Sequence, residues 1–233
     1  MPSAVLHPMF DRQILRVVIG SRAYGLDGTD SDTDRRGVFL PTADQHWSLD
    51  GVPEVLKEDP IEWMAWELQK FLRLALKANP TVLECLFTPL VEQATPLGRE
   101  LLELRTVFLS KRLHATCGGY AEQQFAKLRR RTEARKPINW KHAAHCLRLL
   151  ATGAKALAGD GFPVHVGPHR DVLLGVRRGE KSLEEVDELR AEWSSGLDLA
   201  LRNSPLPATP DVEEVDAFLI HARRLAAKSK DLP

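Results

Sequence analysis

Short apolar runs alternate with polar turns in the first third of the chain. Residues 14–19 form a β-branched run followed by Gly and Ser, which predicts a buried strand that ends in a turn. Residues 26–34 are rich in Gly, Asp, Thr and Ser and predict a loop, and residues 34–40 predict a second strand. Residues 43–53 show no regular pattern. A third strand is expected within 54–63, where a proline interrupts it or places it at a sheet edge.

Apolar positions recur with a helical period beyond this point. Residues 63–77 place Trp, Phe and Leu side chains on one helical face, and a short helix is expected at about 81–87. Two more amphipathic helices are predicted at about 97–115 and 118–134. The clearest helix, 139–158, has an apolar face and an opposite stripe of Lys, His, Arg and Thr side chains that is typical of a solvated surface.

The last third continues this helical pattern. A short hairpin is predicted near 162–176, and two acidic helices follow at about 182–201 and 211–228. A Pro-rich stretch, 204–210, joins these two helices. The chain therefore predicts a small α/β head followed by a mostly helical body.

Composition narrows the class of protein. The 233 residues are 27% charged and 43% hydrophobic, a globular balance that excludes disorder as the main state. No apolar stretch approaches the ~18 residues of a membrane span, and no secretory signal is evident. Three widely spaced cysteines suit a reducing compartment, so we expect a soluble, cytoplasmic protein without a membrane partner. Nothing in the sequence indicates an oligomeric state.

Charge is balanced overall but unevenly distributed. The formal net charge is +0, yet residues 127–148 contain eight basic residues and one acidic residue, whereas residues 180–216 contain eleven acidic and three basic residues. The asymmetry is compatible with a local anion-binding face, or with two segments that face each other or water. The neutral total argues against a general nucleic-acid coat.

The residues with the clearest chemistry lie between the first two predicted strands. The turn Gly20-Ser21 presents backbone N–H groups and a hydroxyl, which can cradle a phosphate. Asp32 and Asp34 are two residues apart at the start of a strand, so their carboxylates share one face and repel each other unless a cation lies between them. Such oxygen ligands select Mg²⁺ or Mn²⁺. Taken alone, the two aspartates are also typical turn and capping residues.

Other ion and phosphate motifs do not fit. An EF-hand loop that began at Asp30 would need Gly and Glu where Arg35 and Pro41 stand. No Walker lysine follows a Gly-rich loop, and the G-x-G-x-x-G pattern is absent from the sequence.

The same residues resemble a known family. Gly20-Ser21 followed by Asp32-x-Asp34 resembles the signature of the DNA polymerase β-type nucleotidyltransferase superfamily, and the longer string from Gly20 to Phe39 resembles its RNA-ligase-associated (RNA repair) group. Weaker matches continue to about residue 180. The resemblance implies an α+β fold: a small polymerase-β-like catalytic head, with a mixed sheet flanked by helices, at 1–95, and a helical body at 96–233.

The resemblance also implies roles for the motif residues. Asp32 and Asp34 would bridge two Mg²⁺ (or Mn²⁺) ions that align an NTP for in-line attack on its α-phosphate. Gly20 and Ser21 would hold the β- and γ-phosphates, and Arg22 could add a bidentate phosphate contact.

Superfamily members use a third carboxylate from a later strand. Alignment with the family pattern puts Glu62 where an aspartate usually stands, which makes Glu62 the expected third metal ligand and catalytic residue. Asp59 and Glu58 are rivals a few residues away, and Pro60 perturbs the strand between them.

Residues of the long helix match the family pattern further along. Lys141 and Arg148 would contact the nucleotide by this resemblance, whereas the helical stripe alone indicates a solvated face. His142 and His145 have no carboxylate nearby in sequence and predict neutral imidazoles packed beside the helix. Glu84 also matches a family position, although pairing at the helix surface explains it equally well.

These features lead to one functional hypothesis with alternatives. We expect a Mg²⁺-dependent enzyme that moves an NMP from an NTP, ATP first, to a hydroxyl acceptor at an RNA end. One alternative keeps the chemistry and changes the acceptor to a protein or a small molecule. The other is an NTP- or RNA-binding module whose catalysis has decayed at the third carboxylate.

Overall fold

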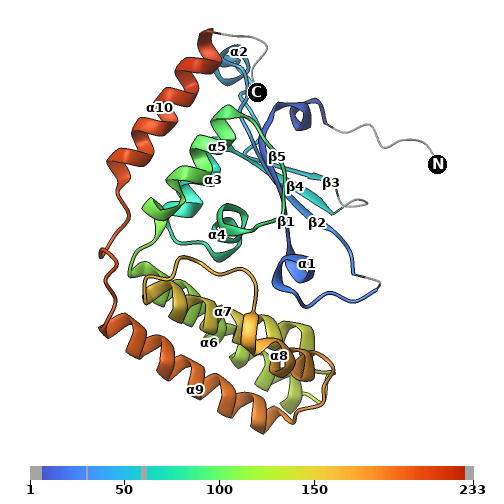
Figure 1. Cartoon of the computed structure of the whole chain (residues 1–233). Coiled ribbons are helices and arrows are strands. Elements are labelled where there is room, and N and C mark those ends of the chain that lie inside the picture. The colour runs from blue at the N-terminus through green and yellow to red at the C-terminus, as the bar shows by residue number, and fades with distance from the viewer. Residues whose placement is uncertain (1–6, 30, 59–61, 229–233) are drawn as a thin grey trace, which may run out of the picture.

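A mixed sheet forms the head of the molecule (Figure 1). The computed structural model describes residues 7–29, 31–58 and 62–228. Within these residues five strands pair in the order β3-β4-β2-β1-β5, with β2 and β4 parallel and the other neighbours antiparallel. Their bounds are Gln13–Ile19 for β1, Asp34–Phe39 for β2, Val55–Glu58 for β3, Trp63–Glu67 for β4 and Val91–Ala94 for β5.

The strand predictions are confirmed in part. The strands expected at 14–19 and 34–40 are β1 and β2. The third strand expected within 54–63 is β3, which lies at an edge of the sheet as the proline suggested. The helix expected from residue 63 is wrong at its start, because Trp63–Glu67 is strand β4 and pairs with β2 on one side and β3 on the other.

Helices cover one face of the sheet. Within the head, α1 spans Gly20–Tyr24, α2 Ala43–Trp47, α3 Leu68–Leu76, α4 Pro80–Phe87 and α5 Pro96–Glu103. Helices α3, α4 and α5 pack against the sheet and enclose the main core. Phe39, Leu56 and Ala65 of the strands form a smaller apolar cluster with Phe10, which lies in the 3₁₀ helix Pro8–Arg12 before β1. The irregular structure expected at 43–53 is wrong for its first five residues, which form α2. A capping box between Thr42 and Gln45 begins this helix.

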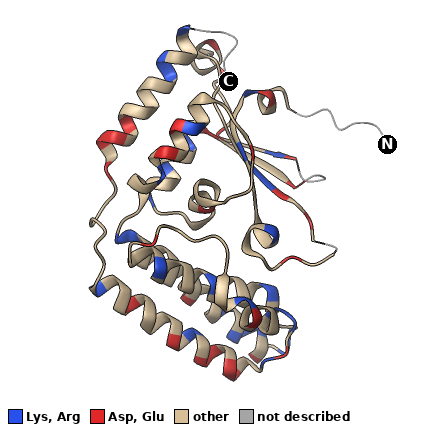
Figure 2. Cartoon of the chain, viewed as in Figure 1, with Lys and Arg blue, Asp and Glu red and all other residues tan. Residues whose placement is uncertain are grey.

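The body is built around one helix. Here α6 spans Arg112–Glu133, α7 Trp140–Leu157, α8 Arg170–Arg177, α9 Leu183–Arg202 and α10 Val212–Lys228. Helices α6, α8 and α9 pack around α7, and Arg129 of α6 pairs with Asp187 of α9 at 2.6 Å. Part of the basic segment therefore faces the acidic one, as one of the two interpretations of the charge pattern expected (Figure 2).

Two predictions for the body are wrong. The helix expected at 97–115 is broken into α5, a 3₁₀ helix η3 at Leu104–Phe108 and the start of α6. In place of the hairpin expected near 162–176, the chain forms an extended stretch and then α8. Phe162, Val164 and Val166 alternate inward as a strand would, but they have no strand partner. Leu173 and Val176 are three residues apart and bury one face of a helix.

Two elements of the segment 96–233 lie against the head. Helix α5 packs on β1, and α10 runs back along α2 and α3 (Figure 1). The Arg223 guanidinium of α10 donates to Gln69 Oε1 of α3 at 3.1 Å. In the part of the chain that the structure describes, none of the helices has the length and apolarity needed to cross a membrane.

Candidate active site

The Gly20-Ser21 turn and Asp34 meet at the end of the first two strands. Ile19 at the end of β1 is paired with Asp34 at the start of β2, and α1 begins at Gly20. Gly20 has φ +76°, and a Cβ atom at this position would lie only 2.1 Å from Asp34 Oδ2. Only glycine allows this backbone conformation together with such a close carboxylate. The geometry thus brings the predicted phosphate turn and one predicted metal ligand into direct contact.

Asp32 lies on the loop that leads to β2, and Arg22 holds that loop. The Arg22 guanidinium donates to the backbone oxygens of Ser31 at 2.7 Å and Asp32 at 3.3 Å. Arg22 lies outside the lining of the two large cavities near Asp34, so its place differs from the predicted phosphate contact. The arrangement makes Arg22 a positioning residue for the Asp32 loop.

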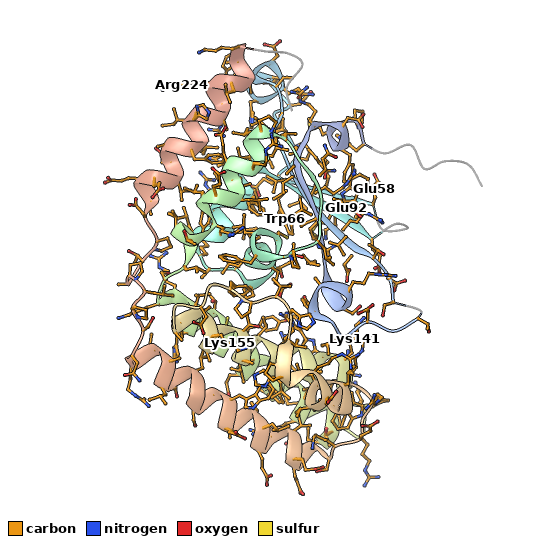
Figure 3. All side chains as sticks on the ribbon, in the orientation of Figure 1. Glu58, Trp66, Glu92, Lys141, Lys155 and Arg224 are labelled. Carbon is orange, nitrogen blue, oxygen red and sulfur yellow. The ribbon has the colours of Figure 1, made fainter. Side chains whose placement is uncertain are left out.

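A cavity of about 370 Å³ opens between the head and the body at this point. Gly20, Ser21 and Asp34 line it from the head, and Lys141 and His145 of α7 line it from the body. Figure 3 shows Lys141 at the start of α7, next to α1. The remaining residues that line the 370 Å³ cavity are Tyr24, Leu26, Tyr120, Asn139, His142, Ala144, Arg148 and Arg177. This volume and mixture of apolar and polar groups are typical of a small-molecule site.

The two histidines of α7 form a neutral, aromatic part of this cavity. Burial, with the positive charges of Arg148 and His142, lowers the pKa of His145 to about 3. Burial, with Lys127 nearby, also lowers the pKa of His142. The Tyr120 ring meets His145 edge-on at 5.8 Å between centroids. Both imidazoles are therefore neutral at pH 7, as the sequence predicted.

Arg148 is buried at the base of this cavity and joins the body to the head. Only 1% of its side chain is exposed, so the solvated stripe expected on α7 is wrong at this position. Its Nη2 atom lies 2.5 Å from Glu84 Oε1, and its guanidinium lies 3.7 Å from the ring centroid of Tyr24. The Tyr24 hydroxyl donates to the other Glu84 oxygen at 2.6 Å. Glu84 is only 2% exposed, which overturns the interpretation of this residue as a surface partner.

The electrostatics of this network favour a charged Arg148. Burial opposes the charge, but the adjacent Glu84 carboxylate and Tyr24 outweigh it and raise the pKa of Arg148. Burial also raises the pKa of Tyr24, with a further contribution from Glu84, so its hydroxyl remains a donor. Two buried donors of Arg148, Nε and Nη1, have no hydrogen-bond partner among the described residues. A ligand in the cavity could accept from them, which keeps the predicted nucleotide contact of Arg148 open.

A second, larger cavity of about 700 Å³ adjoins the first and shares Leu26, Asp34, Lys141 and Arg177 with it. Asp32, Asp34 and Glu62 all line this second cavity. Glu62 follows the undescribed residues 59–61 and has φ +48°. Its rival Glu58 lines a smaller neighbouring space with Asp34 and Glu62, whereas Asp59 lies outside the described residues.

The carboxylates of this cavity are of the type that binds a hard divalent cation, but they do not form a group of three ligands. Carboxylate oxygens that face one solvent-filled space are the ligands that Mg²⁺ prefers. Among the described residues, however, no three His, Cys, Asp or Glu side chains gather closely enough to hold a metal ion. Asp32, Asp34 and Glu62 line one cavity, and Asp32 and Asp34 remain the predicted metal ligands.

Sequence reasoning missed several residues of this site. Tyr120 and Asn139 line the cavity but belong to no motif, whereas Arg177 lies among the weaker family matches near residue 180. Their place depends on α6 and α8 packing against α7, which no local pattern reports. The match of Glu84 to a family position was a signal for the buried network, but surface pairing explained it equally well.

Comparisons with known proteins identify the family of this chain. A model of the RNA repair pathway DNA polymerase beta family matches residues 8–221. The chain is 36% identical over 97 residues to the uncharacterized protein YcgL of Bacillus subtilis (strain 168), and the match spans 40% of this chain and 37% of that protein. A crystal structure of a nucleotidyltransferase-like protein from Exiguobacterium sibiricum 255-15 aligns over 93% of this chain and 75% of that chain, with 14% identity and a TM-score of 0.34.

Proposed function

Because the chain belongs to the RNA repair pathway DNA polymerase beta family, we propose that it is a divalent-metal-dependent nucleotidyltransferase whose acceptor is an RNA end. The observation that carries this proposal is the contact between the Gly20 turn and the Asp34 carboxylate at the mouth of a nucleotide-sized cavity. Phosphate-binding backbone and a metal-binding carboxylate are required side by side for transfer from a triphosphate.

The proposed reaction moves an NMP from an NTP, with ATP as the first substrate to test. The oxygen of the acceptor hydroxyl forms a bond to the α-phosphorus and releases its proton to water. The bond from the α-phosphorus to the oxygen that bridges it to the β-phosphate breaks, and pyrophosphate leaves with the electron pair. When bound, Mg²⁺ or Mn²⁺ supplies Lewis-acid stabilisation of the charge that develops on these oxygens.

The residues of this chain orient the two reactants. Asp32 and Asp34 would hold the metal, and Arg22 would keep the Asp32 loop in place through its two backbone contacts. The Gly20-Ser21 turn and the Lys141 ammonium would bind the triphosphate, since they line the same cavity from opposite sides. The neutral aromatic part around Tyr120 and His145 would receive the nucleobase.

A transfer assay with α-labelled NTPs tests the proposal. Purified chain is incubated with Mg²⁺ or Mn²⁺ and, separately, with RNA and protein acceptors. We expect label in RNA, no label after chelation of the metal, and a loss of more than about 100-fold for Asp34→Asn. Asp50→Asn, an exposed aspartate far from the site, is the matched control and should retain the wild-type rate. Label in protein only would favour the alternative acceptor.

One observation favours a second candidate, a binding module without catalysis. No third carboxylate gathers with Asp32 and Asp34 in the described residues. If Glu62 is nevertheless the third ligand, Glu62→Gln should lower the transfer rate and Glu58→Gln should not. Retained Mg-NTP binding without transfer to any acceptor would establish the second candidate.

A further inference from the structure

The 700 Å³ cavity has walls of opposite charge. The charged residues that line it from the body are all basic: Lys141, Arg170, Arg177 and Arg178. Among the described residues, those that line it from the head are all acidic: Asp27, Asp32, Asp34 and Glu62. The basic residues belong to α8 and the start of α7, whereas the acidic ones belong to the segment from α1 to the start of β2 and to the residue before β4. Figure 2 colours the two charge types on the ribbon. A ligand here meets cations on one side and the proposed catalytic carboxylates on the other.

The basic wall is anchored to the opposite wall by its own side chains. Arg170 Nε donates to the Gly25 oxygen at 2.9 Å, and Arg177 Nη1 donates to the Leu26 oxygen at 2.7 Å. Half of the Arg170 side chain and 58% of the Arg178 side chain remain exposed. The guanidinium groups therefore have a fixed base and accessible donors, which is an arrangement suited to phosphate groups.

We propose that this cavity is the acceptor site, and that it binds a single-stranded RNA end with its phosphates against α8 and its terminal hydroxyl toward Asp32 and Asp34. This inference rests on the proposed function. A polyanion next to the carboxylate wall would be repelled, whereas on the α8 side each phosphate meets an arginine. The adjoining smaller cavity holds the NTP, and the shared residues Lys141 and Arg177 lie where the two substrates meet.

Substitutions of Arg178 and Glu180 should change RNA affinity in opposite directions, which tests the proposal. Glu180 holds Arg178 through two contacts, 2.5 Å to Nε and 3.0 Å to Nη2. RNA must compete with Glu180 for this guanidinium. Removal of the arginine charge should therefore weaken RNA binding, and removal of the Glu180 charge should strengthen it.

The experiment measures binding of a fluorescent ten-nucleotide oligoribonucleotide by anisotropy over a range of salt concentrations. We expect the Arg170→Gln/Arg178→Gln double variant to bind about 2- to 30-fold more weakly. The slope of log affinity against log salt should fall by about 0.7 for each phosphate contact removed. Glu180→Gln should bind more tightly. Because the loss of Arg170 also removes its contact to Gly25, Arg178→Gln alone provides a second readout on a mostly exposed group.

Two controls match these charge changes away from the cavity. Arg224→Gln and Glu213→Gln alter exposed residues of α10, and Figure 3 shows Arg224 at the far end of the molecule. Both should leave RNA affinity unchanged. Arg170 and Arg178 do not line the smaller cavity, so NTP affinity should also be the same in the double variant.

The outcomes separate this inference from the proposed function. Equal RNA binding by wild type and the double variant would overturn the acceptor site, even if label is transferred to RNA. Transfer to a polypeptide at a rate that the double variant does not change would overturn it as well. RNA affinity that changes as expected in the Arg178 and Glu180 variants, without any nucleotide transfer, would support the RNA site in the 700 Å³ cavity and overturn the proposed transferase activity.

Discussion

Breaking the buried pair between Arg148 and Glu84, which connects the body to the head, should strongly destabilise the fold. Arg148 comes from α7 and Glu84 from α4, and both side chains are almost fully excluded from solvent. Arg148→Met keeps much of the side-chain volume but leaves the Glu84 carboxylate buried with only the Tyr24 hydroxyl as a close partner. The same change removes the guanidinium from the face of the Tyr24 ring.

The magnitude follows from the burial. Loss of one partner of a buried ion pair costs about 3–5 kcal/mol, because the other charge stays in a poorly solvated place. That is a large part of the ~5–15 kcal/mol by which a folded domain is stable. In the double variant Glu84→Gln/Arg148→Met the unpaired charge is gone. We therefore expect the double variant to be more stable than the sum of the single losses predicts, by about 0.5–3 kcal/mol.

Urea denaturation followed by tryptophan fluorescence measures these free energies of unfolding. Arg224→Met, on the exposed face of α10, is the matched control and should change stability by less than about 0.5 kcal/mol. A loss below about 1 kcal/mol for Arg148→Met, or strictly additive losses in the double variant, would refute the network as a coupled buried unit.

Three further predictions concern the site. Gly20→Ala should abolish transfer and lower the free energy of unfolding by about 1–3 kcal/mol, since its Cβ would lie 2.1 Å from Asp34 Oδ2. The control Gly196→Ala has open space around it and should not destabilise the fold, which thermal melts followed by circular dichroism would show. Lys141→Met should weaken NTP binding about 10-fold or more with little change in melting temperature, measured by equilibrium dialysis. The pKa of His145 falls from 6.5 to about 3 on folding, so the unfolded chain binds a proton between these values that the folded chain does not. Stability should therefore decrease as pH falls below 6.5, by about 2 kcal/mol at pH 5, and His145→Gln should flatten this part of the urea-midpoint curve against pH.

The local part of the site could be predicted from the sequence. The β-branched run before Gly20-Ser21 and the Asp32-x-Asp34 spacing lie within about twenty residues, and short-range rules predict both the strands and the turn between them. The structure adds that Gly20 and Asp34 touch, because Ile19 and Asp34 are register partners in the β1–β2 pair. Register follows from pairing, which an isolated strand pattern does not specify.

The sequence predictions that the structure contradicts failed because contacts between distant residues decide these positions. Trp63 and Trp66 are three residues apart, which suits a helix, and the pairing with β2 and β3 makes this segment a strand. Arg148 lies on a polar stripe that resembles a solvated face, and it is buried by Glu84, a residue 64 positions away. Asp59, one of the three candidates for the third metal ligand, lies outside the described residues.

The division of the chain expected at residue 95 does not coincide with the division of the site. The head supplies Gly20, Ser21 and Asp34, but the opposite wall with Lys141 and His145 belongs to α7. The same helix inserts Arg148 under Tyr24, which is part of α1, the helix that begins at the phosphate turn. A displacement of α7 would therefore shift the turn and the facing wall together. Because the proposed nucleotide cavity requires both parts, nucleotide affinity and the stability of the Arg148 network should change in parallel among variants at this junction.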